Sequence, residues 1–209
     1  IQLPMISCPG NSAVANTPGL CSAIVSYTTP VGTDNCSGAT TIRSLTANGN
    51  LQISGGTLEL TADSSISGTF TLAGGTLAGA GTLTLAGNGN RWDGGAMTGS
   101  GTTRVAPAAD LLITGRLGDL TLSERTIRND GTIVVDRGTT GEVVIQPSGA
   151  ALIHNLGTFE FAGKARIGDP ANPTSGPRFE NQSLLQVRAD SALAVDLVNA
   201  GTVEVHAGA

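Results

Sequence analysis

Two glutamates are the strongest candidates for acid–base chemistry in this sequence. Glu160 and Glu204 occupy the same position in two copies of a repeated phrase, and Gln186 holds that position in the copy between them. If the copies stack as strands, the two carboxylates lie about 9.6 Å apart, close to the separation that inverting glycoside hydrolases use. The surrounding sequence offers them no evident acid–base partner. We therefore expect a solvated row of side chains and no catalytic residue.

A second group of oxygen-bearing side chains lies in segment 87–93. Asn88, Asn90 and Asp93 are near enough in sequence to suit calcium, but the glycine-rich calcium-binding nonapeptide is not repeated here. Trp92, the only tryptophan, could stack on a sugar or a partner protein, although a cap on an apolar face is the more common role. We predict an ordinary loop with Trp92 as a candidate ligand contact, and neither a metal site nor a cofactor.

Histidines and threonines suggest two further kinds of site, and neither pattern is complete. His154 and His206 are far apart in sequence and have no serine–histidine–aspartate grouping around them, so we expect outward polar side chains. An ice-binding surface would need an exposed Thr-x-Thr in many successive coils. The chain has this pattern at residues 69–71 and 82–84 and loses it at 102–104. We predict no ice-binding surface.

Repeated short phrases are the strongest signal for the fold. One phrase recurs at Gly56, Gly75 and Gly95, and the spacing between its copies is nearly constant. A second phrase has an apolar residue, a polar residue, Asn, a turn residue and Gly or Ser, followed by an alternating strand. Its four copies contain Asn129, Asn155, Asn181 and Asn199; the first two intervals are equal and the third is shorter. Repeats of such length predict coils of two or three short strands that stack on one another.

The repeated asparagines have a structural interpretation. A buried Asn at a coil corner can bond the backbone of its own turn and the amide of the Asn in the next coil. Such a ladder satisfies polar groups that burial would otherwise leave unpaired. We expect the four asparagines to form this ladder, beside an inner column of apolar side chains: Ile133, Phe159, Leu185 and Val203.

The sequence thus predicts an all-β chain whose main part, residues 46–209, is a parallel β-helix (β-solenoid) of roughly eight coils. A strand of three to five residues cannot bury its apolar face alone, whereas stacked coils make a continuous core. The proline-containing segment 169–178 is expected to leave the stack as a loop, and the register of 106–124 stays open. Residues 1–45 are expected to form a small N-terminal β segment that bears a disulfide.

All three cysteines lie in that N-terminal segment: Cys8, Cys21 and Cys36. No histidine is near them, and their spacing does not fit a zinc site. Clustered cysteines indicate disulfide formation in an oxidising compartment, and hence secretion. Because three is odd, one thiol is free or pairs outside this chain, and all three pairings remain open.

The N-terminal segment also carries a pattern in residues 6–9 (ISCP), 19–27 (GLCSAIVSY), Pro30 and 34–37 (DNCS). This pattern resembles the first half of a hyalin-repeat (HYR) domain, an immunoglobulin-like extracellular module, over about 35 residues. The second half of that module is not visible, so its strand edges would need cover from the solenoid or from another subunit. From residue 46 the repeat style resembles the right-handed parallel β-helices of bacterial adhesins and autotransporter passengers.

Charge and hydropathy narrow the function. A net charge of −5 with scattered basic residues disfavours a nucleic-acid partner, and no stretch approaches the ~18 apolar residues of a membrane span. The start at Ile1 suggests a mature product or a fragment. We expect a non-enzymatic, secreted structural or adhesion protein of a bacterial cell surface. Its expected partners are further copies, joined through the solenoid ends as a homo-oligomer or filament, and a glycan or cell-surface molecule. The alternative is a polysaccharide-binding or polysaccharide-degrading β-helix protein.

Overall fold

The computed structural model describes residues 5–7, 31–33, 39–138, 141–171 and 176–206. The chain divides into two units, Ile1–Gly38 and Ala39–Ala209. In the first unit, β1 (Met5–Ser7) and β2 (Val31–Thr33) form an antiparallel pair. The three cysteines lie outside the described residues, so the disulfide and the HYR-like module remain predictions.

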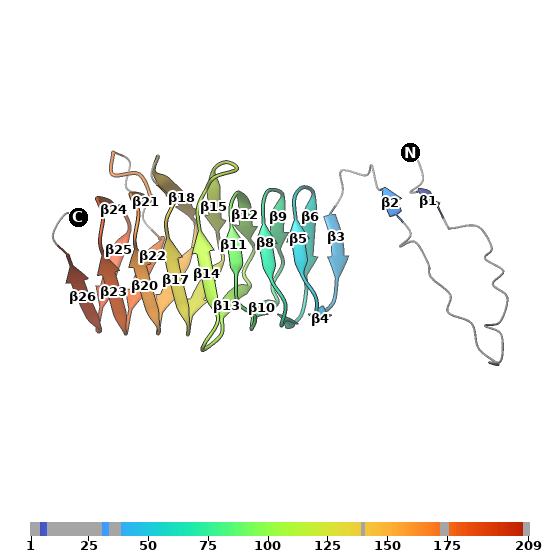
Figure 1. The fold of residues 1–209 in the computed structure, drawn as a ribbon, viewed down its shortest axis with the longest axis horizontal. Helices are drawn as coiled ribbons and strands as arrows, with labels where there is room; N and C mark the ends of the chain where they lie inside the picture. The colour runs from blue at the N-terminus through green and yellow to red at the C-terminus, as the bar shows by residue number, and fades with distance from the viewer. Residues whose placement is uncertain (1–4, 8–30, 34–38, 139–140, 172–175, 207–209) are drawn as a thin grey trace, which may run out of the picture. The chain divides into compact units, whose positions relative to one another are not determined.

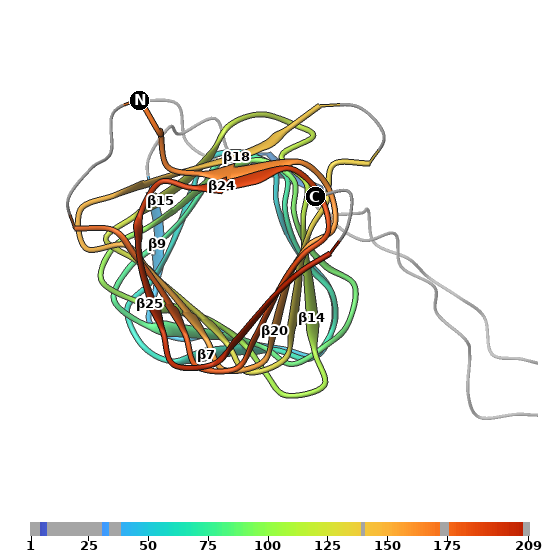
Figure 2. The same cartoon turned by 90° about the vertical axis from the view of Figure 1, so that its left-hand side faces the viewer.

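The second unit is a parallel β-solenoid, which confirms the predicted fold class. Three eight-stranded sheets form its walls, and each coil contributes one strand to every sheet (Figure 1 and Figure 2). Every pairing between neighbouring coils is parallel and in register. The eight strands of a sheet are separated by seven steps of about 4.8 Å, which makes the stack about 34 Å long.

The first sheet contains β3 (Ala39–Ile42), β6 (Thr57–Leu60), β9 (Thr76–Ala78), β12 (Gly95–Thr98), β15 (Leu120–Ser123), β18 (Val143–Ser148), β21 (Ala165–Ile167) and β24 (Ser191–Leu193). The second sheet contains β4 (Thr46–Ala47), β7 (Ser64–Ile66), β10 (Thr82–Leu85), β13 (Thr102–Val105), β16 (Thr126–Asn129), β19 (Leu152–Asn155), β22 (Arg178–Asn181) and β25 (Asp196–Asn199). The third sheet contains β5 (Leu51–Ile53), β8 (Phe70–Leu72), β11 (Asn90–Trp92), β14 (Asp110–Ile113), β17 (Thr132–Val135), β20 (Thr158–Phe161), β23 (Leu184–Val187) and β26 (Thr202–Val205).

The pairing of strands between coils follows the repeats in the sequence. It also places segment 106–124, whose register the repeats did not determine. Thr57 pairs with Thr76 and Thr76 with Ala96, so the spacing of the glycine-containing phrase is the real length of a coil. Segment 106–124 holds β14 and β15, and the last residue of the expected loop 169–178, Arg178, already begins β22. The solenoid begins at Ala39, earlier than the expected boundary at residue 46.

The core fills the space between the three walls. Strand alternation turns every second side chain inward, and like positions of successive coils stack into columns. One column of the third sheet runs through Leu72, Trp92, Ile113 and Val135, all fully buried. Because each inner coil is covered by two others, short strands can still bury large side chains.

Candidate functional site

The four predicted asparagines occupy one column of the second sheet, on β16, β19, β22 and β25. Asn129 Nδ2 donates to Asn155 Oδ1 at 2.8 Å. Asn155 and Asn181 repeat this bond to the next asparagine at 2.7 Å, and the last acceptor is Asn199. The first three asparagines are fully buried. Each also donates to a backbone carbonyl of the following coil, those of Thr158, Leu184 and Thr202. The ladder therefore satisfies polar groups that the fold buries.

Segment 87–93 is not the ordinary loop that the sequence predicted, because residues 90–92 form strand β11. Asn90 points into the core, where Oδ1 accepts the Phe70 N–H at 2.8 Å. Its Nδ2 donates to the carbonyls of Gly87 and Asp110. Asn90 is a buried polar anchor of the third sheet, comparable to the asparagines of the ladder, and its oxygen is not available to a cation.

Trp92 is not a surface residue, so its assignment as a candidate ligand contact is wrong. Its side chain is fully buried. It stacks between Leu72 and Ile113 in the inner column of the third sheet. Alternate side chains of β11 point into the core, and Trp92 is one of them, so a sugar has no access to the indole ring.

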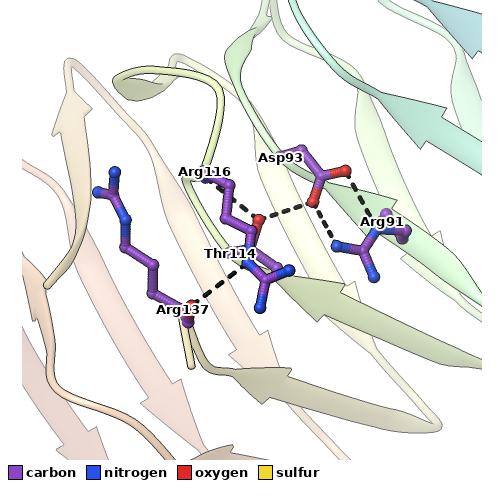
Figure 3. A network of polar contacts seen from close by, with 5 residues as sticks. All are labelled: Arg91, Asp93, Thr114, Arg116 and Arg137. Atoms are coloured by element: carbon purple, nitrogen blue, oxygen red, sulfur yellow. Dashed lines mark hydrogen bonds and ion pairs between the residues drawn. The ribbon is translucent and has the colours of Figure 1, made fainter. Parts of the chain in front are cut away.

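Asp93 forms the centre of a polar network at the corner between the third and first sheets (Figure 3). Arg91 donates to both of its carboxylate oxygens, at 3.0 and 2.9 Å, and Thr114 Oγ1 donates at 2.6 Å. Burial alone would raise the pKa of Asp93. The hydrogen bonds from Arg91 and Thr114 and the charges of Arg91 and Arg116 outweigh it and hold that pKa below its usual value. A carboxylate held ionised in this way cannot serve as a general acid near neutral pH.

Arg125 is a buried charged residue that was not predicted from the sequence. It is fully buried, in the corner between β15 and β16. Nε donates to Thr103 Oγ1 at 2.9 Å, and the terminal nitrogens donate to four backbone carbonyls of two earlier coils: Gly79, Gly81, Thr98 and Thr102. Burial lowers the pKa of Arg125 to about 10. Its donors are taken up by the protein itself, so Arg125 joins three coils and does not act on a substrate.

The glutamate row on the outer face of the third sheet has the predicted order, Glu160, Gln186 and Glu204. Glu160 forms an ion pair with Arg188. Gln186 Nε2 donates to Glu204 Oε2 at 2.9 Å. The side chains thus pair with one another along the row, as they would on a structural surface.

The other predicted polar residues are dispersed. His154 lies between Arg128 and Glu180 on the outer face of the second sheet, whereas His206 follows β26 at the last coil. The two Thr-x-Thr strands are not continued: Thr71 pairs with Arg91, and Thr84 with Arg104.

A groove lies on the outer face of the second sheet. It has a volume of about 450 Å³ and is lined by Thr82, Thr102, Arg104 and Arg128. The two arginines lie directly beside each other on β13 and β16, and both pair with Asp130. Burial would raise the pKa of Asp130, but the hydrogen bonds and charges of the two arginines lower it. No local motif in the sequence marks this groove, because its residues come together only through the coil register.

Comparison with protein-family models, with curated proteins and with solved structures finds no match. Across the described residues, no group of three or more His, Cys, Asp or Glu side chains is placed to hold a metal ion. Within the same residues, no helix has the length and apolar character needed to cross a membrane.

Proposed function

We propose that this chain is a non-enzymatic rod segment of a secreted bacterial surface protein, which serves structure or adhesion and stacks end to end on a second copy. The main support is the last described coil, which contains β24, β25 and β26. Leu197, Val203 and Val205 continue inner columns of the core, yet they are 44%, 41% and 71% exposed. An exposed stack end of this kind is suited to cover by another coil.

The edge strands support the same proposal. β24, β25 and β26 each lie at the edge of their sheet. An open depression of about 580 Å³ adjoins this end, with Val187, Ala192 and Val205 in its lining. Three parallel edges and an apolar centre match the pattern that each inner coil presents to its neighbour. A second copy could therefore add its own first coil in the same register.

The charged residues favour a structural role over catalysis. The carboxylates with lowered pKa values, Asp93 and Asp130, are both held by arginines. Glu160, the best catalytic candidate, is paired with Arg188. A hydrolase needs one carboxyl that can donate a proton, and the arginine contacts of Asp93 and Asp130 favour the ionised form of these two carboxylates. The location outside the cell rests on the clustered cysteines and on the resemblance to HYR modules and bacterial adhesins.

Self-association is the direct test of the proposal. We expect the mass from light scattering and the particle length in electron micrographs to rise with protein concentration. Val205→Glu, which puts a charge on the open end, should leave a monomer, because burying an unpaired carboxylate is costly. Val144→Glu, on the outer face of β18 beside Arg166, is the matched control and should assemble normally. Monomers alone at high concentration would contradict the proposal.

The enzymatic alternative has its own test. We expect no turnover of a panel of neutral and acidic polysaccharides by the full chain. Turnover that is lost in Glu160→Gln would establish a polysaccharide-degrading protein and overturn the non-enzymatic assignment.

A further inference from the structure

The groove on the second sheet has a set of donors that the protein does not use. Arg104 contacts Asp130 through Nε, and Arg128 contacts it through Nε and Nη2. Among the described residues, both terminal nitrogens of Arg104 and Nη1 of Arg128 have no acceptor. The ionised Asp130 fixes the two guanidinium groups while their free edges stay at the surface, with side-chain exposures of 38% and 43%.

This arrangement suits an oxyanion. A guanidinium presents its N–H groups in a planar fork that matches carboxylate and sulfate groups. Two arginines against one aspartate leave an excess of one positive charge at the arginine end of the groove, and Asp63 adjoins the other end, where it accepts the Thr82 backbone N–H. The chain as a whole has a net charge of −5, so this positive surface is local and not part of a general attraction for anions.

The remaining lining residues suit a sugar. Thr82 and Thr102 are paired on β10 and β13, next to the arginine row, and their hydroxyl groups can donate to and accept from sugar hydroxyls. One pyranose ring of an extended chain is similar in length to the strand-to-strand step of about 4.8 Å. Neighbouring rings of a polysaccharide that runs along the solenoid axis would therefore meet successive coils.

We propose that the groove lined by Thr82, Thr102, Arg104 and Arg128 binds an acidic polysaccharide, with a carboxylate or sulfate group on the two guanidinium edges and sugar hydroxyls on the threonines. Nucleic acid fits less well. Single-stranded binding needs aromatic stacking platforms, and the lining has none. The proposal does not depend on end-to-end stacking, since the groove lies on β10, β13 and β16, away from the last coil.

Calorimetric titration of the full chain tests this site with three probes: an oligogalacturonate for the carboxylate source, a heparin oligosaccharide for the sulfate source and neutral dextran as the control. We expect binding of at least one acidic probe, weaker at high salt, and none of dextran. Arg104→Gln and Arg128→Gln should each lower the affinity about tenfold or more. Arg178→Gln is the matched control, because Arg178 lies on the same sheet and pairs with Glu180 outside the groove; its affinity should be unchanged.

Two further variants separate the parts of the proposal. Arg104→Lys keeps the charge and loses the fork, so an intermediate affinity is expected even if a glutamine variant folds poorly. Thr102→Val should weaken oligosaccharide binding by about threefold, a lost neutral hydrogen bond, and leave the binding of inorganic sulfate unchanged. If Thr102→Val leaves the affinity for the oligosaccharide unchanged, the groove binds only the carboxylate or sulfate group, and the proposed contact between the threonines and the sugar is wrong. Equal losses in Arg178→Gln and Arg104→Gln, or no acidic probe bound, would overturn the site.

Discussion

Asn155 is the residue on which the interior of the ladder depends most. Its amide accepts from Asn129, donates to Asn181 and donates to the Leu184 carbonyl. Asn155→Ala removes these three hydrogen bonds. Asn129 Nδ2 keeps the Thr158 carbonyl as acceptor, whereas Asn181 Oδ1 and the Leu184 carbonyl lose the Asn155 donor, and a buried group left without a partner costs about 1–3 kcal/mol. We expect a loss of about 3 kcal/mol in the free energy of unfolding, measured by urea denaturation.

Asn199→Ala is the matched control for that variant. Asn199 ends the same ladder at an exposed position, so water can replace its partners. We expect a loss of less than about 1 kcal/mol. Equal losses in the two variants would show that the ladder adds nothing beyond the local turn.

Arg125 gives the stability of the solenoid a distinctive dependence on pH. Because burial lowers its pKa to about 10, the folded chain releases this proton at a lower pH than the unfolded chain. Above that value the unfolded state therefore binds more protons, and this group's contribution to stability rises with pH until the unfolded chain also loses its proton. Below it, both states are protonated and the contribution is constant.

Arg125→Met tests this sign. At neutral pH we expect the variant to be less stable by on the order of 3 kcal/mol, because its carbonyl acceptors lose their donor. Between about pH 8 and about pH 11, urea denaturation should show the stability of the wild type rising relative to the variant. A difference that stays flat or narrows over this range would contradict the lowered pKa.

At the residue scale, sequence reasoning found side chains that repeat and missed those that do not. The interval of the asparagines was sufficient to place Asn129 beside Asn155. Arg125 occurs once, and its acceptors lie up to 46 residues away in other coils. Its only sequence cue is that it stands at a corner where earlier coils have Gly81 and Gly101. Trp92 was wrongly predicted as a surface residue, because the register between coils decides whether a side chain points inward or outward. That register aligns Trp92 with the buried Leu72 and Ile113.

The corners between the first and second sheets limit how the elements can stack. A Cβ on Gly101 would lie 2.4 Å from the Gly81 carbonyl oxygen and 2.6 Å from that of Gly79. The obstacle is backbone, which cannot move without separating the coils. We expect Gly101→Ala to cost about 1–3 kcal/mol through overpacking, measured by thermal and urea denaturation.

Gly55→Ala is the control for this prediction. Gly55 also lies at a corner, but a Cβ there has nothing within 4 Å. We expect unchanged stability or a gain of a few tenths of a kcal/mol, because alanine reduces the entropy of the unfolded chain. A similar loss in both variants would mean that glycine is needed for turn conformation and not for close stacking.

Corner length also explains which elements the sequence could not place. Between β11 and β12 the corner consists of Asp93 and Gly94 alone, whereas the corner between β14 and β15 runs from Thr114 to Asp119. Gly95 consequently pairs with Leu120, and this coil is longer than those that pair Thr57 with Thr76 and Thr76 with Ala96. A search for a fixed period loses the register at that point. It recovers where the Asn phrase begins, because from Asn129 onward the same residue type marks each coil of the second sheet.

At the scale of the whole molecule, the stack should be least stable in its first and last coils. In a solenoid each coil contacts only its neighbours, so an end coil lacks half of the interface that an inner coil has. The strand residues of β25 and β26 are exposed throughout, whereas β16 and β17 each bury every second side chain. We therefore expect amide hydrogen exchange to be slowest in the middle coils and fastest in the two end coils, segments 39–53 and 196–206.

The proposed end-to-end contact adds a dependence on concentration to this gradient. If a second copy covers the last coil, its first coil pairs with the outer edges of β24, β25 and β26, and their amides become protected by mass action. Exchange in segment 196–206 should slow between micromolar and millimolar protein, while exchange in β16–β20 stays the same. Val205→Glu should remove the concentration dependence and keep the gradient, because the inner columns of the other coils are intact. If exchange in the wild type does not depend on concentration, the proposal of a contact between copies is contradicted, whereas the solenoid fold of the single chain is unaffected.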